Sequence, residues 1–292
     1  MDGAPDLLAW ADAWEAAFER CALAYSENVA PILASLAEGA LEGGSITRGA
    51  RVLDVACGPG MVTRAAAERA TASGLVVGLD TSPTMVRTAR GAVERAGASA
   101  RPHFAAASGR ALPFRPATFD AVLSSFGLPL SGTQAELDEC LRVLKPGGLL
   151  SFVHFGPEFI EPLFEVSGIL RRHRTESPSQ FLAMYRELSY RLEKEFHKRR
   201  APEALGAQLE ASGFEVVDIH KVPVRQRLWG IMNFVDFALS FPLNYLEHQE
   251  MGPDARAAFH ADCQADLKKH MDLEEFIAPA TLVFAVAKRP AK

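Results

Sequence analysis

The chain contains 292 residues, 48% of them hydrophobic and 23% charged, which is the composition of a packed globular protein rather than of a disordered or fibrous one. A formal net charge of −5 provides no overall positive field for DNA or RNA, so we do not expect a nucleic-acid partner. Because it lacks both the pattern of a signal peptide and an apolar stretch of bilayer-spanning length, the sequence predicts a cytoplasmic protein without a membrane span.

The chain begins with a predicted amphipathic helix, because apolar residues recur there at steps of three and four: Leu7, Trp10, Trp14, Phe18 and Cys21. From Arg51 onward, short apolar segments alternate with helical ones, which predicts parallel strands joined by helical crossovers. The expected strands cover residues 52–55, 75–80, 102–106, 119–124 and 149–155. Between them, Ser82-Pro83 has the pattern of a helix start, and Lys145-Pro146-Gly147-Gly148 is expected to end a helix before the fifth strand.

Two long helical segments interrupt the later part of this pattern, at about residues 158–200 and 231–271. Two further strand-like segments, 214–227 and 281–288, are expected to close the sheet. Because ligands of open α/β sheets bind beyond the carboxyl ends of the strands, helices inserted after the fifth and sixth strands are expected to form a lid over that crevice. Aromatic residues in or beside these regions favour an apolar or aromatic ligand: Phe126, Phe155, Phe159, Trp229, Phe234, Phe237, Phe241 and Tyr245.

The strongest chemical signal is the turn Asp54-Val55-Ala56-Cys57-Gly58-Pro59-Gly60 after the first strand, whose glycines permit a tight bend and close approach to a ligand. Thr63 stands where a dinucleotide fingerprint has its third glycine or an alanine, which disfavours NAD. No Gly-Lys-Ser or Gly-Lys-Thr follows, so the turn is not a P-loop. Asp54 would repel a pyrophosphate but attract the ammonium and sulfonium charges of S-adenosylmethionine (SAM); its alternative role is to cap the turn.

Two later strand ends extend this predicted site. Asp80 ends the second strand about 20 residues beyond Gly60, where an acidic residue commonly accepts hydrogen bonds from ribose hydroxyls; helix capping is the alternative. After the third strand, Ser108 and Gly109 form a turn that could place a hydroxyl and backbone amides against adenine, with a plain turn as the alternative.

The segment from Val52 to Gly60 resembles the first motif of class I SAM-dependent methyltransferases. Asp80 resembles their ribose-binding acid, and Leu112-Pro113-Phe114, Phe119-Asp120-Ala121-Val122 and Leu141-Arg142-Val143-Leu144-Lys145-Pro146-Gly147-Gly148 resemble the later motifs in order. The resemblance covers about residues 51–155, and the subgroup is similar to the ubiquinone and menaquinone biosynthesis type, which methylates small metabolites.

This resemblance implies a Rossmann-like α/β fold: a doubly wound, seven-stranded, mostly parallel sheet, with SAM as cofactor and S-adenosylhomocysteine (SAH) as product. Two positions depart from the family pattern. Ala56 stands where the motif usually has glycine, and Ser108 stands where the subgroup usually has an aspartate for the adenine amino group. The cofactor-binding residues that we expect are Asp54, Ala56, Gly58, Gly60, Asp80, Thr81, Met85, Ser108, Gly109 and Ser124.

The expected organisation is a continuous series of segments around one sheet. They are an N-terminal helical cap (1–48), a SAM-binding Rossmann-like core (49–156), a helical insertion (157–200), a sheet-completing helix and strand (201–229), a second helical insertion (230–278), and the final strand and tail (279–292). Acceptor recognition is assigned to the cap and the insertions, because the cofactor motifs all precede Leu149.

Methyl transfer is an in-line displacement at a sulfonium methyl group, so alignment and exclusion of water matter most, and a catalytic base is optional. His154 is the candidate base, because it lies at the end of the fifth strand and imidazole titrates near neutral pH; a structural histidine is the alternative. Tyr25 is a second candidate site residue, which could cover the cofactor or present a hydroxyl, since resembling enzymes often use an aromatic residue before the first motif. No metal is expected, and the widely spaced cysteines predict buried, reduced thiols: Cys21, Cys57, Cys140 and Cys263.

The sequence therefore predicts a methyltransferase that acts on an oxygen, carbon or nitrogen atom of a small, apolar or aromatic metabolite. After the fourth strand, residues 124–129 lack the Asn-Pro-Pro-Tyr or Asp-Pro-Pro-Tyr segment of enzymes that methylate bases and glutamine. Two alternatives stay open: an RNA or protein methyltransferase that uses the basic runs 171–174 and 197–200, and a SAM-binding protein without transferase activity. The oligomeric state also stays open, with a homodimer as one form.

Overall fold

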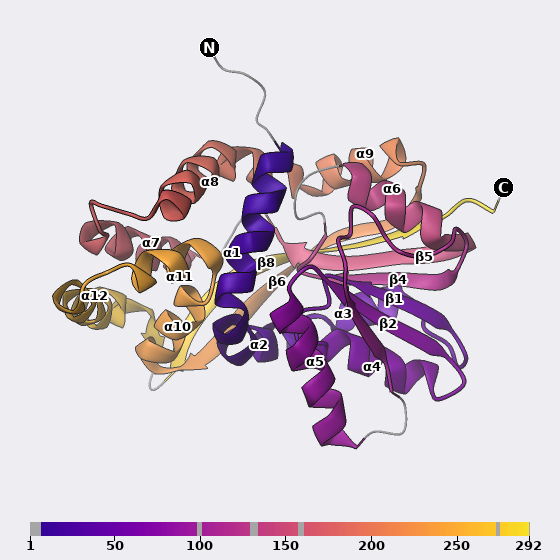
Figure 1. The fold of residues 1–292 in the computed structure, drawn as a ribbon, viewed down its shortest axis with the longest axis horizontal. Coiled ribbons are helices and arrows are strands. Elements are labelled where there is room, and N and C mark those ends of the chain that lie inside the picture. Colours follow the sequence, from indigo (N-terminus) through magenta and orange to yellow (C-terminus); the bar gives the residue numbers. More distant parts are fainter. Residues whose placement is uncertain (1–6, 98–100, 129–133, 157–160, 273–274, 292) are drawn as a thin grey trace, which may run out of the picture.

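The computed structural model describes residues 7–97, 101–128, 134–156, 161–272 and 275–291 (Figure 1). Its strands are β1 (Arg51–Val55), β2 (Leu75–Asp80), β3 (His103–Ala106), β4 (Phe119–Ser125), β5 (Leu144–Phe155), β6 (Glu215–Trp229), β7 (Met271–Asp272) and β8 (Glu275–Lys288). They form one sheet in the order β3-β2-β1-β4-β5-β8-β6, with β7 paired to β8 beside this path. Strands β1 to β5 are parallel, and β8 is antiparallel to β5 and β6. The predicted seven-stranded, mostly parallel sheet is confirmed, with β7 as a short addition.

The central strands are apolar almost throughout because helices cover both faces of the sheet. In β1, Val52 packs in a core with α3 (Glu38–Gly43) and α4 (Met61–Ala70), whereas Leu53 packs on the opposite face with α6 (Gln134–Val143) and α9 (Pro202–Ala211). The remaining crossover helix, α5 (Pro83–Ala96), packs on β2 and β3. The sheet is therefore doubly wound, as the alternation of strands and helices predicts.

The predicted helix start at Ser82-Pro83 is confirmed, since the Ser82 hydroxyl accepts a hydrogen bond from the Met85 N–H at 3.0 Å at the beginning of α5. At the other boundary the structure differs from the expectation. Helix α6 ends at Val143, and residues 145–148 belong to β5 itself rather than to a separate turn. The register of β5 against β4 shifts there, and Gly147 has a φ of 80° that favours glycine.

The N-terminal helix α1 (Leu7–Asn28) lies between the sheet and a lobe of later helices, and α2 (Ala30–Leu36) continues it (Figure 1). The lobe consists of α7 (Glu161–His173), α8 (Gln180–Arg199), α10 (Gly230–Leu239), α11 (Pro242–Gln249), α12 (Pro253–Asp266) and the short η1 (Leu267–His270). Trp10 of α1 stacks on Tyr185 of α8, with ring centroids 5.5 Å apart. The predicted apolar stripe of α1 thus packs against the first insertion.

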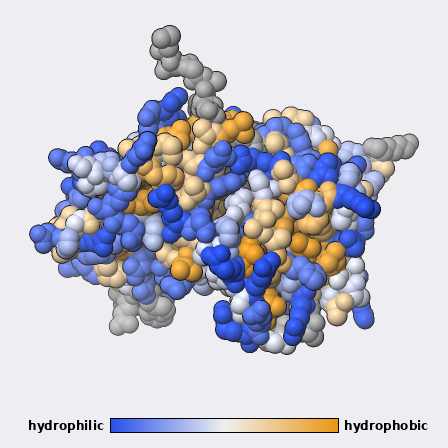
Figure 2. Space-filling model, in the orientation of Figure 1, coloured by the Kyte–Doolittle hydropathy of each residue, from blue (hydrophilic) through white to orange (hydrophobic). Residues whose placement is uncertain are grey.

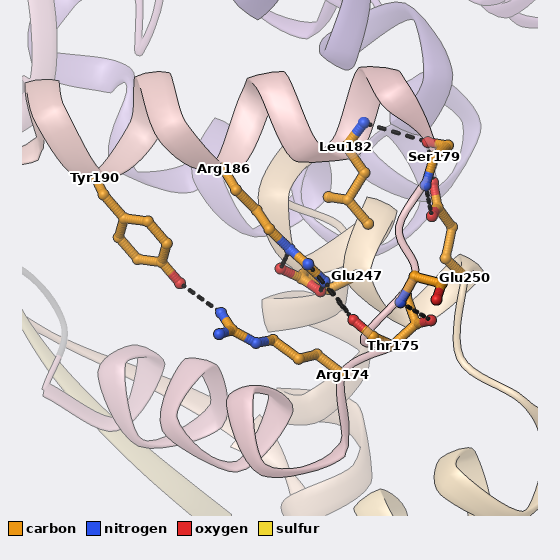
Figure 3. A network of polar contacts seen from close by, with 9 residues as sticks. Arg174, Thr175, Ser179, Leu182, Arg186, Tyr190, Glu247 and Glu250 are labelled. Atoms are coloured by element: carbon orange, nitrogen blue, oxygen red, sulfur yellow. Dashed lines mark hydrogen bonds and ion pairs between the residues drawn. The ribbon is translucent and has the colours of Figure 1, made fainter.

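A buried polar network joins the two insertions to each other (Figure 3). Arg186 of α8 donates to both carboxylate oxygens of Glu247 on α11, at 2.6 and 2.5 Å, and its guanidinium also reaches the carbonyl oxygen of Thr175. Nearby, the backbone N–H and the hydroxyl of Ser179 both donate to Glu250. Only 12% of the Arg186 side chain and 6% of the Glu247 side chain are exposed, so this ion pair lies within the lobe.

The described helices include none that combines the length and the apolar character needed to cross a bilayer. In the space-filling view of the same face, apolar surface is interspersed with hydrophilic surface over both the lobe and the sheet region (Figure 2).

Candidate active site

A cavity of about 1090 Å³, its solvent-open mouth included, lies at the carboxyl ends of the first four strands. Its lining includes residues at or just after the end of each of these strands: 55–59 for β1, 80 and 81 for β2, 107 and 109 for β3, and 125–128 for β4. Its lining combines apolar side chains with a few polar groups, as is usual in pockets that bind cofactors and small ligands. It occupies the position at which open α/β sheets bind their ligands.

The glycine turn after β1 forms one wall of this cavity. Ala56, Gly58 and Gly60 have φ angles of 57°, 53° and 80°, so the alanine adopts a left-handed conformation that glycine adopts more easily. A Cβ atom built on Gly60 would lie 2.8 Å from the ring of Phe104, whereas one built on Gly58 meets no atom within 4 Å. Packing therefore requires glycine at position 60, and the bare backbone at Gly58 faces open space where a ligand can approach.

Asp80 connects the glycine turn to the end of β2. One carboxylate oxygen accepts a hydrogen bond from the Gly58 N–H at 2.8 Å, and the other accepts one from the Ser82 N–H at 2.9 Å. Burial raises the pKa of this carboxyl to about 6, against the lowering effect of these two hydrogen bonds. A carboxylate offers about four acceptor positions, so Asp80 keeps capacity for two further donors on the side that lines the cavity.

Asp54 lies behind the glycine turn rather than in the cavity lining. Its Oδ2 atom accepts a hydrogen bond from the Thr63 hydroxyl at 2.6 Å, and its Oδ1 atom is buried with no hydrogen-bond partner in the part of the chain that the structure describes. Burial, together with the nearby charge of Asp80, raises the pKa of Asp54 to about 7. A buried acceptor of this kind favours a cationic or hydrogen-donating ligand above the turn.

The structure brings most of the predicted cofactor residues to one cavity but leaves some outside it. The predicted residues that line the cavity are Tyr25, Ala56, Gly58, Asp80, Thr81, Met85 and Gly109. Ser108 accepts hydrogen bonds from the N–H and Nε of Arg110, and the Ser124 hydroxyl donates to the carbonyl of Val55 at 2.8 Å. Like Asp54 and Gly60, these two serines support the turns without lining the cavity, whereas Ser125 does line it.

His154, the candidate base, is 5% exposed and lies outside the cavity lining. Side chains alternate along a strand, and His154 stacks near Phe152, which packs with α6 and α9 on the face opposite Val153. Its Nδ1 atom is 2.6 Å from the Phe155 carbonyl oxygen, and burial lowers the pKa of the imidazole to about 4. This geometry favours the alternative given above for His154, a structural histidine rather than a catalytic base.

The roof of the cavity differs from the lid that the sequence predicts. It is formed by α1 and α2, through residues that include Trp14, Phe18, Tyr25, Leu33 and Ala34. None of the described lining residues comes from either insertion, so the expectation that 158–200 and 231–271 line the pocket is corrected. The reason is that α1 fills the space between sheet and lobe, and the insertions pack on its outer side.

One contact from the second insertion still reaches the wall of the cavity indirectly. Phe241 packs edge-on against Tyr25, with ring centroids 6.1 Å apart. Of the other predicted aromatic residues, Phe126 lines the cavity, Phe159 lies outside the described residues, and the Trp229 side chain is also not described. The sequence assigned acceptor recognition to the N-terminal cap as well as to the insertions, but it did not predict that α1 separates the insertions from the cavity, because the stripe of α1 is equally typical of ordinary core packing.

Polar contacts at several points along α1 hold it over the cavity. Arg110, in the loop after β3, donates to Asp12 at 2.8 Å and to Glu15 at 2.9 Å. Farther along the helix, Glu19 accepts a hydrogen bond from the Thr84 hydroxyl at 2.6 Å and another from the Ser82 hydroxyl. These contacts connect α1 to the ends of β2 and β3, and therefore fix the distance between roof and floor.

Comparison with known proteins identifies the family. A methyltransferase domain model matches residues 52–148. The ubiquinone/menaquinone biosynthesis C-methyltransferase UbiE of Klebsiella pneumoniae (strain 342) is 31% identical over 179 residues, which cover 61% of this chain and 71% of the relative. UbiE of Escherichia fergusonii matches with the same identity and coverage. The chain belongs to the class I SAM-dependent methyltransferases. It is an enzyme of the small-molecule type, with SAM as cofactor and SAH as product.

Solved structures agree with this fold at low sequence identity. The [4+2]-cyclase SpnF superposes with a TM-score of 0.52 and 22% identity, covering 89% of this chain and 81% of that one. The YcgJ protein of Bacillus subtilis gives a TM-score of 0.53 and 15% identity, covering 88% and 98%.

The cavity fits SAM on its own chemistry. The space beside Gly58 is open at the turn where the sequence predicts the amino-acid part of the cofactor, and the buried Oδ1 of Asp54 suits a nearby positive charge. Asp80 retains acceptor positions for the two ribose hydroxyls. Within the described residues, no three side chains of the kinds that bind metals cluster together, and the four cysteines are free and buried.

Proposed function

We propose that the enzyme transfers the methyl group of SAM to an oxygen, carbon or nitrogen atom of a small, apolar or aromatic metabolite. The observation that supports this most is the composition of the cavity beyond the glycine turn. There, Leu33 and Ala34 of α2 line the cavity together with Phe126, which packs on Phe155 with 4.8 Å between ring centroids. An apolar enclosure of this kind suits a flat or hydrocarbon acceptor.

When bound, SAM supplies an electrophilic methyl group on a sulfonium. The residues of the chain align the acceptor and exclude water, which are the main requirements for an in-line displacement. Tyr25 lines the same cavity, and burial raises the pKa of its phenol above the ordinary value. The phenol therefore stays neutral and donates a hydrogen bond to an acceptor oxygen instead of removing a proton. We infer that Tyr25 positions the acceptor and that no side-chain base is needed.

In the first of the two basic runs that would attract a nucleic acid, residues 171–174, three of the four side chains make contacts within the protein. Arg172 pairs with Asp262 and Asp266 at 3.1 and 2.8 Å, and His173 contacts Asp262 at 2.8 Å. Arg174 contacts the Tyr190 hydroxyl at 3.5 Å. In the second run, burial lowers the pKa of Arg200 to about 10, and residues 197 and 198 have no described side chains. These pairings favour a small-molecule acceptor over RNA.

The test is methyl transfer from labelled SAM to a panel of phenols, hydroquinones, aromatic amines and fatty acids, with total RNA and denatured protein as competing acceptors. We expect label in an organic-extractable product whose formation requires one compound of the panel. Label that enters only RNA or protein would contradict the proposal. Mass spectrometry of the product then identifies the methylated atom.

Replacing Phe126 with alanine should lower kcat/KM for the acceptor by about tenfold or more, because the acceptor loses an aromatic wall, while SAH affinity stays within about threefold. The matched control is Phe164→Ala on α7, where the phenylalanine is 42% exposed and away from the cavity. Steady-state kinetics and calorimetry measure the two effects. Equal losses of SAH affinity and acceptor turnover in Phe126→Ala would place this residue at the cofactor instead.

SAH binding should weaken as the pH falls, by about tenfold between pH 8 and pH 5.5. The raised pKa values, about 7 for Asp54 and about 6 for Asp80, leave both carboxyls ionised at pH 8 and largely protonated at pH 5.5. A ligand that donates hydrogen bonds or carries positive charge binds the ionised forms better, so binding at low pH must first remove protons. Calorimetry across this range measures the effect. Asp54→Asn should show a smaller pH dependence, and an unchanged profile would contradict the assignment.

A further inference from the structure

The cavity contains a buried acid that the family motifs do not include. Glu136 lies in the first turn of α6, is 6% exposed and lines the cavity. Burying a carboxyl group is costly unless it meets hydrogen-bond donors, and a donor on a ligand in this cavity would add to that compensation. Sequence patterns alone give a structural reason, since Thr133 and Glu136 have the spacing of a capping box at the start of a helix.

Glu136 lies at one particular end of the cavity. A Cβ atom built on Gly109 would lie 4.0 Å from the Cγ of Glu136 and 3.1 Å from a methyl group of Val55. The same end of the cavity is reached by the part of α1 that Arg110 holds through Asp12 and Glu15. Glu136 therefore lies by the loop after β3, while Tyr25 and Phe126 pack against the apolar cluster that includes Leu33.

Asp80 also lines the cavity, and the ribose contact expected there sets the direction of the cofactor. With the amino-acid part at the open backbone of Gly58 and the ribose at Asp80, the base must extend toward Gly109. The residue expected to meet adenine there, Ser108, accepts hydrogen bonds from Arg110 and does not line the cavity. The amino group of adenine is a donor, and an acid at this end supplies the complementary acceptor.

We propose that Glu136 recognises the adenine amino group of the cofactor, with its carboxylate as the acceptor for the exocyclic N–H. The hydrogen-bond acceptor for the adenine ring then comes from the helix after β4 instead of the loop after β3. This proposal rests on the proposed cofactor site and adds to it the residue that selects an amino-substituted purine.

The test compares SAH with its purine analogue, in which hydrogen replaces the adenine amino group, by calorimetry. The native enzyme should bind SAH at least about tenfold more tightly than the analogue, because one hydrogen bond to a charged acceptor is lost. In Glu136→Leu the preference should fall to within about threefold. Glu136→Gln keeps an acceptor oxygen and should show an intermediate preference. The control is Asp138→Asn, an exposed acid on the same helix, which should keep the native preference.

A purely structural Glu136 gives a different result. Loss of a helix cap would lower the unfolding temperature and weaken both ligands equally, so an unchanged ratio in Glu136→Leu and Glu136→Gln overturns the proposal. A native preference below about threefold overturns it without any variant, even if Glu136→Leu does not fold. Failure of the native enzyme to bind SAH at all would instead contradict the proposed cofactor site.

Discussion

Replacing Glu247 with leucine should lower the free energy of unfolding by about 3–5 kcal/mol, because it leaves the buried guanidinium of Arg186 without its partner. The pair is bidentate, and its two side chains are 12% and 6% exposed, so water cannot replace the lost carboxylate without opening the lobe (Figure 3). The carbonyl of Thr175 alone is a weaker partner for the guanidinium. Urea unfolding monitored by circular dichroism measures the loss.

Two further variants separate this effect from the mere loss of a charge. Arg186→Met combined with Glu247→Leu removes both charges and should recover most of the stability, because neither buried ion is left unpaired. Glu187→Gln breaks an exposed pair with Arg191, with 73% and 53% of the two side chains exposed, and should cost less than about 1 kcal/mol. A Glu247→Leu protein as stable as Glu187→Gln would show that the buried pair does not hold the insertions together.

Replacing Asp80 with alanine should weaken SAH binding by about 1.5–3 kcal/mol, roughly 10- to 150-fold. The substitution removes the acceptor positions for the ribose and also frees the Gly58 N–H, which Asp80 holds at 2.8 Å. The glycine turn should then become less ordered at the point where its backbone meets the cofactor. Calorimetry with SAH measures the change, and the unfolding temperature without ligand shows whether the variant is folded.

The matched control for this prediction is Asp120→Asn. Asp120 also accepts a backbone hydrogen bond, from the Arg51 N–H at 2.9 Å, and pairs with Lys145, but it lies near the beginning of β4 at the opposite end of the sheet. We expect SAH affinity within about threefold of the native value in this variant. An Asp80→Ala protein that is folded and binds SAH equally well would remove the ribose role.

The sheet and the floor of the cavity were predictable because local chemistry specifies them. The apolar runs of β1 and β2 indicate strands covered on both faces, and the turn from Gly58 to Gly60 needs conformations that side chains resist. The position of Asp80 then follows from topology, since parallel strands end at a common edge. These features depend on residues close together in sequence, together with rules for strand connection.

Local sequence did not predict which element forms the roof of the cavity, nor toward which face of the sheet an individual side chain points. An aromatic stripe shows that α1 has a buried side but not which element buries it, and here α8 and the cavity divide that side between them. The assignment of His154 depended on which face of β5 it occupies, and a strand buried on both faces gives no alternation from which to read it. In sequence, Glu136 resembles a capping residue, and only the structure shows that it is buried beside Gly109 and lines the cavity.

The site takes its floor from the middle of the chain and its roof from the beginning, and this order has a consequence for folding. Helix α1 is synthesised well before the helices that pack on its outer side, because α8 and α11 end only at Arg199 and Gln249. Strand β8 must also enter between β5 and β6 before the sheet closes. Contacts between such distant segments form slowly, because long loops must close before any contact is made. A nascent chain therefore carries α1 with the outer side of its apolar stripe uncovered until α8 and α11 have been synthesised.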